Sequence, residues 1–223
     1  VASSMTVVAM DVDGVIANFD SHVSGLLGID LHTPRTAFNT AVDYGEEVHH
    51  AIGRLLRDPA FWVSLPPMPG AKEQLARLQD YDRMLLKKGE LQGYSLRLRL
   101  RFYSSLPDQF EGLRRWWLWK VVRAAPHMDA VYLRTPRHAI KGELIMADKG
   151  GVDYYIDDRA DTSDVVASRG AIAYVHPAPW NAGYSGPCPV GDLSAFVDRI
   201  LIDISDSRTD EHSRRGIAAV RDV

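Results

Sequence analysis

The sequence predicts an α/β fold, a Rossmann-like parallel sheet with a small inserted helical cap. Two observations support this prediction. Short runs rich in β-branched residues alternate with longer helical patterns, which is typical of βαβ units around a parallel sheet. About fifty residues of mostly helical character follow the first predicted strand, which is too long for a simple crossover and enough for a small helical module.

Five strands alternate with helical segments along the chain. The predicted strands are Thr6–Val12, Leu96–Tyr103, Ala130–Arg134, Val152–Ile156 and Ala171–His176. The predicted helices are Ala71–Gln79, Gln109–Ala124, Lys141–Lys149, Ser163–Arg169 and Leu193–Leu201. A turn rich in proline begins at Pro66 and marks the return from the cap to the core. We therefore assign residues 5–20 and 66–202 to the core, 21–65 to the cap and 203–223 to a C-terminal tail.

The second predicted strand has an unusual pattern. Its side chains alternate between leucine and arginine, at Leu96, Leu98 and Leu100 against Arg97, Arg99 and Arg101. Such alternation describes a strand with one solvated face, whereas interior parallel strands are usually apolar on both faces. The segment Tyr81–Gly93 before it is also longer than a link from helix to strand requires. We expect a local hairpin or an extended edge here.

Composition bounds the class of protein. The chain has 223 residues, of which 46% are apolar and 25% charged, and this excludes disorder as its main state. Cys188 is the only cysteine, so the chain has no internal disulfide. No apolar run approaches the roughly 20 residues that span a bilayer, and no secretory signal pattern is present. We expect a cytoplasmic protein without a membrane partner.

A basic region lies in the middle of the chain, although the net charge is −3. Residues 83–123 contain ten Lys or Arg and three acidic residues. Such a block is either a nucleic-acid footprint or a solvated face, and we favour the solvated face. The tryptophans of this region belong to one apolar stripe at helical spacing, Leu113, Trp116, Trp117, Val121 and Ala124, which indicates core packing. We therefore expect no nucleic-acid partner, and the sequence leaves a homodimer open.

The sharpest feature of the sequence is an apolar run that ends in Asp-x-Asp-Gly. Asp11 and Asp13 follow the first predicted strand, and Gly14 lets the backbone turn away directly after them. In open α/β sheets, ligands bind at the carboxyl ends of the strands. Two crowded carboxylates repel each other unless a cation lies between them, and hard oxygen ligands suit Mg²⁺. The alternative is a helix-capping or turn pair, which we consider the weaker interpretation.

Three more segments place polar residues at the same edge of the sheet. Asp157 and Asp158 end another apolar strand, and in a parallel sheet they come within reach of Asp11. The hydroxyls of Ser104 and Ser105 end a strand and can donate to a phosphoryl oxygen. Lys141 opens a helix, where its ammonium and the helix N-terminus together can face an anion. Each feature is common alone, but their order along the chain is specific.

This order resembles the haloacid dehalogenase superfamily of phosphohydrolases, from Met5 to about Asn181. The segments Asp11–Phe19 and Phe61–Ala71, together with Pro179–Asn181, are more closely similar to the 5'(3')-deoxyribonucleotidases. The resemblance implies a small helical cap between the first two motifs. Two features depart from the pattern, namely the longer stretch from Lys141 to Asp157 and the arginine-rich strand before Ser104.

The resemblance also implies a role for each matching residue. Asp11 would be the nucleophile that forms an aspartyl-phosphate, and Asp13 would protonate the leaving alcohol and then activate water. Mg²⁺ would be held by Asp11, the backbone carbonyl of Asp13, and Asp157 and Asp158. Ser104, Ser105 and Lys141 would bind the phosphate. Lys149 is a rival for the lysine role, but we prefer Lys141 because it begins its helix.

The expected substrate is a small-molecule nucleotide, a (deoxy)nucleoside 5'-monophosphate. Phe19, Phe61 and Trp62 could form an aromatic wall on which its base stacks, or they could simply fill the core of the cap. A phosphatase acting on polynucleotide ends or on another small ester is an alternative. A non-catalytic protein that binds phosphate ligands on the same scaffold is a further alternative, because fold does not fix function.

Overall fold

A computed structural model describes residues 3–33, 35–92, 95–121, 129–132, 141–148 and 151–206. Its elements are β1 (Ser3–Asp11), α1 (Phe19–Leu27), α2 (Thr40–Leu55), α3 (Pro59–Ser64), α4 (Ala71–Gln92), β2 (Ser95–Ser104), η1 (Asp108–Phe110), α5 (Glu111–Lys120), β3 (Asp129–Tyr132), α6 (Lys141–Ala147), β4 (Tyr154–Asp157), α7 (Ala160–Ser168), β5 (Ile172–Val175) and η2 (Pro179–Asn181). Residues 193–206 form a final helix, which continues past the boundary at residue 202 that we expected for the tail. All five predicted strands are present.

The strands form one parallel sheet in the order β3-β2-β1-β4-β5, which confirms the predicted α/β class. From Val7 to Asp11 both faces of β1 are buried, as expected for a central parallel strand. Val8 and Met10 pack on the side of α4 and the final helix, and Val7 and Ala9 pack on the side of α6 and α7. The molecule therefore has three layers. Within the described ranges, no helix combines the length and apolar character needed to cross a bilayer.

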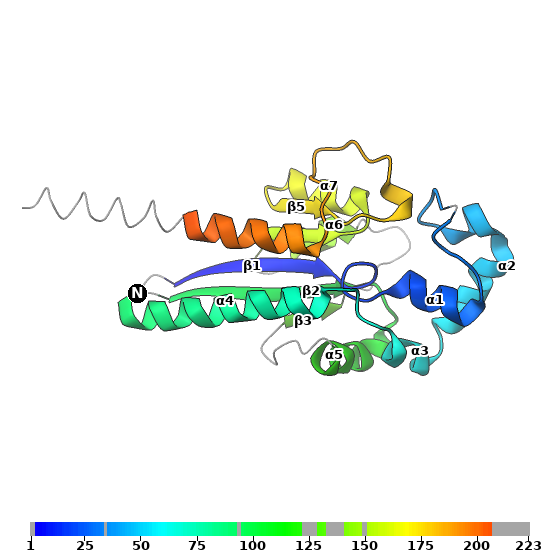
Figure 1. Cartoon of the computed structure of the whole chain (residues 1–223), viewed down its shortest axis with the longest axis horizontal. Helices are drawn as coiled ribbons and strands as arrows, with labels where there is room; N and C mark the ends of the chain where they lie inside the picture. The colour runs from blue at the N-terminus through cyan, green and yellow to red at the C-terminus, as the bar shows by residue number, and fades with distance from the viewer. Residues whose placement is uncertain are drawn as a thin grey trace, which may run out of the picture.

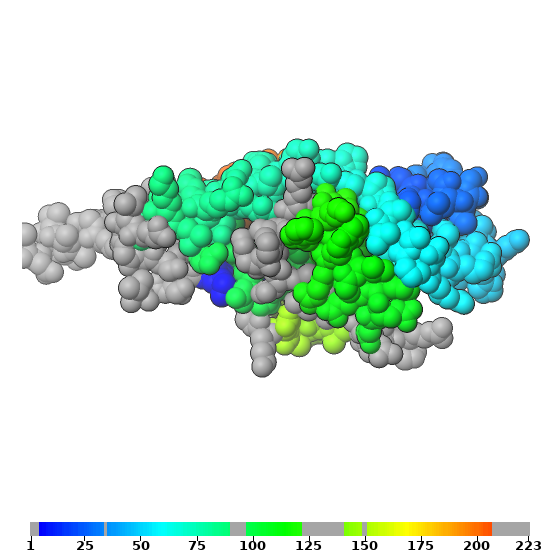
Figure 2. All heavy atoms as spheres, turned by 90° about the horizontal axis from the view of Figure 1, so that it is seen from below, coloured from blue at the N-terminus to red at the C-terminus, as the bar shows by residue number. Residues whose placement is uncertain are grey.

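The helices α1, α2 and α3 lie together beyond the carboxyl ends of the strands (Figure 1). The two connections between this helical segment and the sheet are bonded to each other, because Asn18 N–H donates to Pro66 O at 2.8 Å and Met68 N–H donates to Ile16 O at 2.7 Å. Figure 2 shows α5 beside the α3 segment on the underside of the molecule. The inserted segment thus covers the edge of the sheet where the predicted site residues lie.

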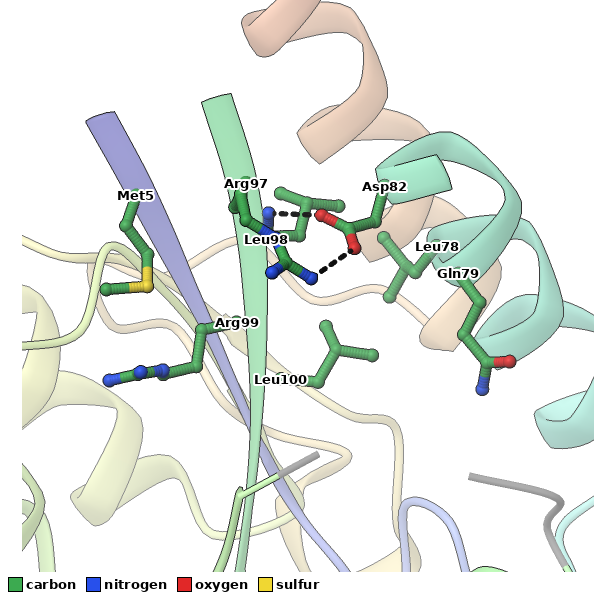
Figure 3. Close-up of a pocket in the computed structure, with 8 residues that line it drawn as sticks. All are labelled: Met5, Leu78, Gln79, Asp82, Arg97, Leu98, Arg99 and Leu100. Atoms are coloured by element: carbon green, nitrogen blue, oxygen red, sulfur yellow. Dashed lines mark hydrogen bonds and ion pairs between the residues drawn. The ribbon is translucent and has the colours of Figure 1, made fainter. Parts of the chain in front are cut away.

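The predicted hairpin before β2 is wrong, because residues 81–92 continue helix α4. The other expectation, that β2 is an edge strand, holds for its first half. Within the described residues, β3 pairs only with Arg101–Ser104 of β2, so residues 95–100 have β1 as their one neighbouring strand. On the other side of this part of β2, the Asp82 carboxylate of α4 accepts hydrogen bonds from Leu98 N–H at 2.7 Å and Arg97 Nη2 at 3.4 Å (Figure 3).

The arginines of β2 do not all face solvent. Arg101 is 4% exposed, and its Nη1 donates to Gly151 O at 3.2 Å and lies 3.4 Å from Asp148 Oδ2. The end of α6 and the loop before β4 therefore cover this side of the strand near its carboxyl end. The period-two pattern correctly predicted that leucines and arginines lie on opposite faces of β2. The prediction that the whole arginine face is solvated was wrong, because a buried arginine is tolerated where it has polar partners.

The helix that carries the tryptophans also differs from the prediction. In α5 the buried residues are Arg114, Trp117 and Leu118, whereas Trp116 is 40% exposed. The predicted apolar stripe therefore placed Trp116 on the wrong face. The buried side includes an arginine because that side chain has an acidic partner at the sheet edge, as described below. Ala124 lies outside the described residues.

Candidate active site

The carboxyl edge of the sheet brings several of the predicted residues together. Asp11 ends β1 and pairs in register with Tyr103 of β2, so Ser104 lies one position beyond it. Met10 pairs with Ile156 of β4, so that Asp11 and Asp157 follow neighbouring residues of adjacent strands. Parallel register thus places groups that are far apart in the sequence at one point of the edge.

Lys141 joins two of these acids. Its Nζ lies 2.5 Å from Asp11 Oδ1 and 2.8 Å from Asp157 Oδ2, and all three side chains are at most 7% exposed. Asp157 also accepts a hydrogen bond from the Tyr155 hydroxyl and another from Arg159 N–H, at 2.9 Å. Lys141 is the first residue of α6, as predicted. The rival Lys149 lies outside the described residues.

Asp158 completes the group and is held from two sides. Its backbone carbonyl accepts hydrogen bonds from Trp180 Nε1 at 3.1 Å and Asn181 Nδ2 at 2.8 Å. Its carboxylate lies against Gly14, where an added Cβ would be 2.1 Å from Asp158 Oδ2. Gly14 has a φ of +88°, a conformation that favours glycine. The glycine of the Asp-x-Asp-Gly motif is therefore needed both for the turn and for the close approach of Asp158.

Burial controls the charge of these acids. It is the largest influence on Asp11 and raises its pKa to about 8, although the Lys141 ammonium opposes the shift. Burial, and then the Asp157 and Asp11 carboxylates, raise the pKa of Asp158 well above its usual range. Burial acts in the same direction on Asp157, but the Lys141 ammonium together with the hydrogen bonds from Tyr155 and Arg159 N–H outweighs it, so the pKa of Asp157 is lowered. Three buried acids thus share one ammonium, and two of them favour the protonated form.

The three acids fit a divalent cation. Asp11, Asp157 and Asp158 each offer a carboxylate oxygen, and these oxygens lie within 4.8 Å of one another in a buried cluster. The donor set consists of hard oxygens, which Mg²⁺ prefers. A cation would also supply the positive charge that a single lysine does not provide. The expected contribution of the Asp13 backbone carbonyl stays a prediction.

The Asp13 side chain points to a different set of partners. Its Oδ2 accepts a hydrogen bond from the Ser104 hydroxyl at 2.9 Å, and its Oδ1 accepts one from Arg114 Nη2 at 2.6 Å. Among the described residues, the three-acid cluster that could hold a metal ion does not include the Asp13 carboxylate. Asp11 and Asp13, two residues apart, therefore lie in different polar environments, one in the acid cluster beside Lys141 and one beside an arginine.

Sequence reasoning missed Arg114. This side chain is fully buried, and its guanidinium lies 5.0 Å from the centroid of the Trp62 ring and 5.5 Å from that of Trp117. Among the described residues, its Nε and Nη1 have no hydrogen-bond partner. An Arg-Arg pair before tryptophans was visible in the sequence, but nothing in it indicated which arginine turns inward.

The predicted aromatic wall is mostly interior. Phe61 and Trp62 are each 3% exposed, and Phe61 packs edge-to-face against Phe19, with ring centroids 5.5 Å apart. Phe19 is half-buried. Their role in base stacking stays a prediction, as does the phosphate-binding role of Ser104, which is buried, and of Ser105, which is exposed.

The comparison with solved structures shows a haloacid dehalogenase-like fold. No family model and no curated protein matches the sequence, whereas solved structures do. The D,D-heptose 1,7-bisphosphate phosphatase of B. bronchiseptica, in complex with magnesium and phosphate, matches with a TM-score of 0.50 at 12% identity, over 89% of this chain and 99% of that chain.

Two further structures of similar description match the chain. A haloacid dehalogenase-like hydrolase from Burkholderia xenovorans LB400 has a TM-score of 0.49 at 12% identity, over 88% of this chain and 96% of its own. The haloacid dehalogenase-like protein SP0104 from Streptococcus pneumoniae has a TM-score of 0.48 at 8% identity, over 88% and 98%. At such identities the likeness concerns the fold. The closer resemblance to the deoxyribonucleotidases stays a prediction.

Proposed function

We propose that this protein is a Mg²⁺-dependent phosphomonoesterase that acts through an aspartyl-phosphate on Asp11. The buried cluster of Asp11, Asp157, Asp158 and Lys141 at the carboxyl edge of the sheet carries the proposal. A bound cation would neutralise the charge of the acids as a phosphate dianion approaches. The phosphatase named for the B. bronchiseptica structure is consistent with this chemistry on the same fold.

Asp11, Asp13, Lys141 and Ser104 have different roles in the proposed reaction. An oxygen of Asp11 attacks phosphorus, the bond from phosphorus to the ester oxygen breaks, and Asp13 gives its proton to the departing alcohol. Water then attacks the aspartyl-phosphate and loses its proton to Asp13, the bond from phosphorus to Asp11 breaks, and inorganic phosphate leaves. Lys141 holds Asp11 in place, and the Ser104 hydroxyl, 2.9 Å from Asp13, lies where it can exchange a bond to Asp13 for one to phosphate.

The substrate class we propose is the (deoxy)nucleoside 5'-monophosphates. The similarity of Asp11–Phe19 and Phe61–Ala71 to the deoxyribonucleotidases supports it. So does the position of the inserted helices over the site, because a segment that covers the strand ends can contact the part of an ester that does not react (Figure 1).

Phosphate release from a panel of monoesters tests the proposal. The panel contains deoxynucleoside and nucleoside 5'-monophosphates, sugar phosphates and a 5'-phosphorylated oligonucleotide, each with Mg²⁺ and with a chelator. We expect turnover that requires Mg²⁺, that is highest with the mononucleotides, and that Asp11→Asn abolishes. Absence of release from every ester would contradict the proposal, as would an Asp11→Asn variant that retains most of the activity. Tight phosphate binding without turnover would favour the non-catalytic alternative.

A further inference from the structure

The structure contains a pocket of about 690 Å³ at the boundary between the inserted segment and the core. Arg35, Thr36 and Phe38, from the loop between α1 and α2, form one wall. Arg159 and Asp161 at the start of α7 and the segment Pro179–Tyr184 after β5 form the other. A volume of this size suits a small organic molecule, for which binding pockets usually measure about 300–1,000 Å³.

The pocket adjoins the acid cluster. Trp180 and Asn181 line it, and both donate hydrogen bonds to the backbone carbonyl of Asp158. Arg159 also lines it, and its backbone N–H donates to Asp157 Oδ1 at 2.9 Å. The residues that line the pocket are therefore hydrogen-bonded to the acid cluster. A molecule with its phosphate at the cluster could extend into the pocket.

An aromatic side chain is presented openly in the pocket. Phe38 lines the pocket and is 52% exposed. By contrast, Phe61 and Trp62, which we expected to contact the base, are 3% exposed. Unlike Phe61 and Trp62, Phe38 can therefore be reached by a ligand without a rearrangement of the interior.

The loop that carries Phe38 is fixed in place. Arg35 donates to the carbonyl oxygens of Ala37 at 3.3 Å and Phe38 at 3.1 Å, and it forms an ion pair with Asp20 of α1 at 2.7 Å. The Asp43 carboxylate accepts hydrogen bonds from the backbone N–H groups of Thr36 and Ala37. An aromatic ring on a fixed loop loses little conformational entropy when it binds a ligand.

The groups around Phe38 suit a planar heterocycle. The Arg159 guanidinium lies 5.0 Å from the centroid of the Phe38 ring. The Trp180 ring contacts Phe38 edge-on, at 5.7 Å between centroids, and has the Arg35 guanidinium 4.0 Å from its own centroid. Aromatic rings and guanidinium planes are the surfaces on which nucleobases stack.

We propose that the nucleobase of the substrate binds in this pocket against Phe38 and beside Trp180, rather than against Phe61 and Trp62. The inference rests on the proposed phosphomonoesterase function and names the part of the protein that selects the substrate. Phe38, from the inserted segment, is then a specificity-determining residue, and the protein prefers leaving alcohols whose sugar carries a planar base to a bare sugar.

A pair of substrates isolates the base. Deoxyribose 5-phosphate has the same reacting group as a deoxynucleoside 5'-monophosphate and lacks the base, so the ratio of the two kcat/KM values measures what the base contributes. We expect the wild-type protein to prefer the nucleotide, and Phe38→Ala to lower this ratio about tenfold or more, chiefly through KM of the nucleotide. Phe38→Trp, which keeps a stacking surface, should retain the ratio.

Two further variants complete the test, a control at Val42 and a probe of the alternative wall at Phe19. Val42→Ala removes an apolar side chain that is 66% exposed and does not line the pocket, so the ratio should not change. Phe19→Leu tests the alternative wall, and we expect the ratio to persist. A ratio that collapses in Phe19→Leu and not in Phe38→Ala would overturn the inference.

The failure of this inference can be told apart from failure of the proposed function. If the wild-type protein releases phosphate from deoxyribose 5-phosphate as efficiently as from every nucleotide, the pocket is not a base site, and the phosphomonoesterase function stands. If no ester of either kind is hydrolysed with Mg²⁺, the function itself is wrong.

Discussion

Arg114 Nη2 lies 2.6 Å from Asp13 Oδ1, and this contact joins a fully buried arginine of α5 to the residue that we propose as the acid and base. Ser104 occupies the other oxygen of the same carboxylate. Two donors on two elements therefore fix the plane of the Asp13 carboxylate. The guanidinium in turn contacts the Trp62 ring of α3 and the Trp117 ring of α5, so the position of Asp13 depends on the packing of α3 against α5.

The first prediction concerns this positioning role. Arg114→Met should lower kcat about 10- to 100-fold with a smaller change in KM, because Asp13 loses one of its two holding groups and general acid–base catalysis is worth about 10²–10⁴-fold. Arg114→Lys should recover part of the loss, since lysine restores the charge but not the planar stacking. Steady-state kinetics on the best ester of the panel measures both effects.

Arg115→Met is the matched control, because Arg115 neighbours Arg114 on α5, is 52% exposed and pairs with Glu111. It should leave kcat unchanged. In an Asp13→Asn background, Arg114→Met should cause little additional loss if the arginine acts through Asp13. An equal loss in both backgrounds would show that Arg114 acts independently.

The second prediction concerns the stability of the metal-free protein. Burial raises the pKa of Asp11 from 3.8 in the unfolded chain to about 8 in the fold. The folded state therefore binds the proton more tightly, and this contribution to the free energy of unfolding falls as pH rises from about 4 to about 8. Asp11→Asn should be more stable than the wild type at pH 8 without metal, by about 0.5–2 kcal/mol, and should lose this advantage near pH 4.

Urea unfolding with a chelator across that pH range measures the difference. Excess Mg²⁺ at pH 8 should stabilise the wild type and leave Asp11→Asn unchanged, because the variant lacks one ligand of the cluster. A difference between the two proteins that does not vary with pH would contradict the raised pKa of Asp11.

The third prediction concerns the pH dependence of Mg²⁺ binding. Asp11 and Asp158 favour their protonated forms in the metal-free protein, whereas a cation needs them ionised. Binding should release protons at pH 7, and affinity should rise by up to about tenfold per pH unit for each proton released. Calorimetry in two buffers with different ionisation enthalpies counts the protons. Binding that releases none would show that the acids are already ionised.

The sequence was sufficient to place the acids of the site. Asp11, Asp157 and Asp158 each follow an apolar strand, and parallel pairing converts that position into proximity, so the cluster is a consequence of topology. Lys141 was predicted because it opens a helix, and a helix that begins at the sheet edge places its first side chain near the strand ends. These inferences required only the order and type of the elements.

Other parts of the site depend on packing that no local pattern shows. Arg114 and Arg115 are the same type of residue and are adjacent on α5. Only the packing of α5 against α3 decides which of them is buried. In the same way, the alternation in β2 predicted a solvated face, but Asp148 and the Gly151 carbonyl cover Arg101. Tertiary neighbours, rather than periodicity, set the environment of these charged residues.

The fourth prediction concerns Gly14, whose Hα side faces Asp158. Gly14→Ala should lower the free energy of unfolding by about 1–3 kcal/mol, because alanine is strained at a φ of +88° and its Cβ would lie 2.1 Å from Asp158 Oδ2. The clash should move the Asp158 carboxylate away from the cluster and weaken Mg²⁺ binding about tenfold or more. Thermal unfolding and calorimetry measure the two effects separately.

Gly28→Ala separates strain from displacement of the ligand. Gly28 also has a positive φ, of +66°, but an added Cβ there meets no atom within 4 Å, so this variant should lose stability and keep its affinity for Mg²⁺. Weaker Mg²⁺ binding confined to Gly14→Ala would then arise from the contact with Asp158, and not from a general loosening of the fold. Equal Mg²⁺ affinity in both variants and the wild type would contradict the assignment of Asp158 as a metal ligand.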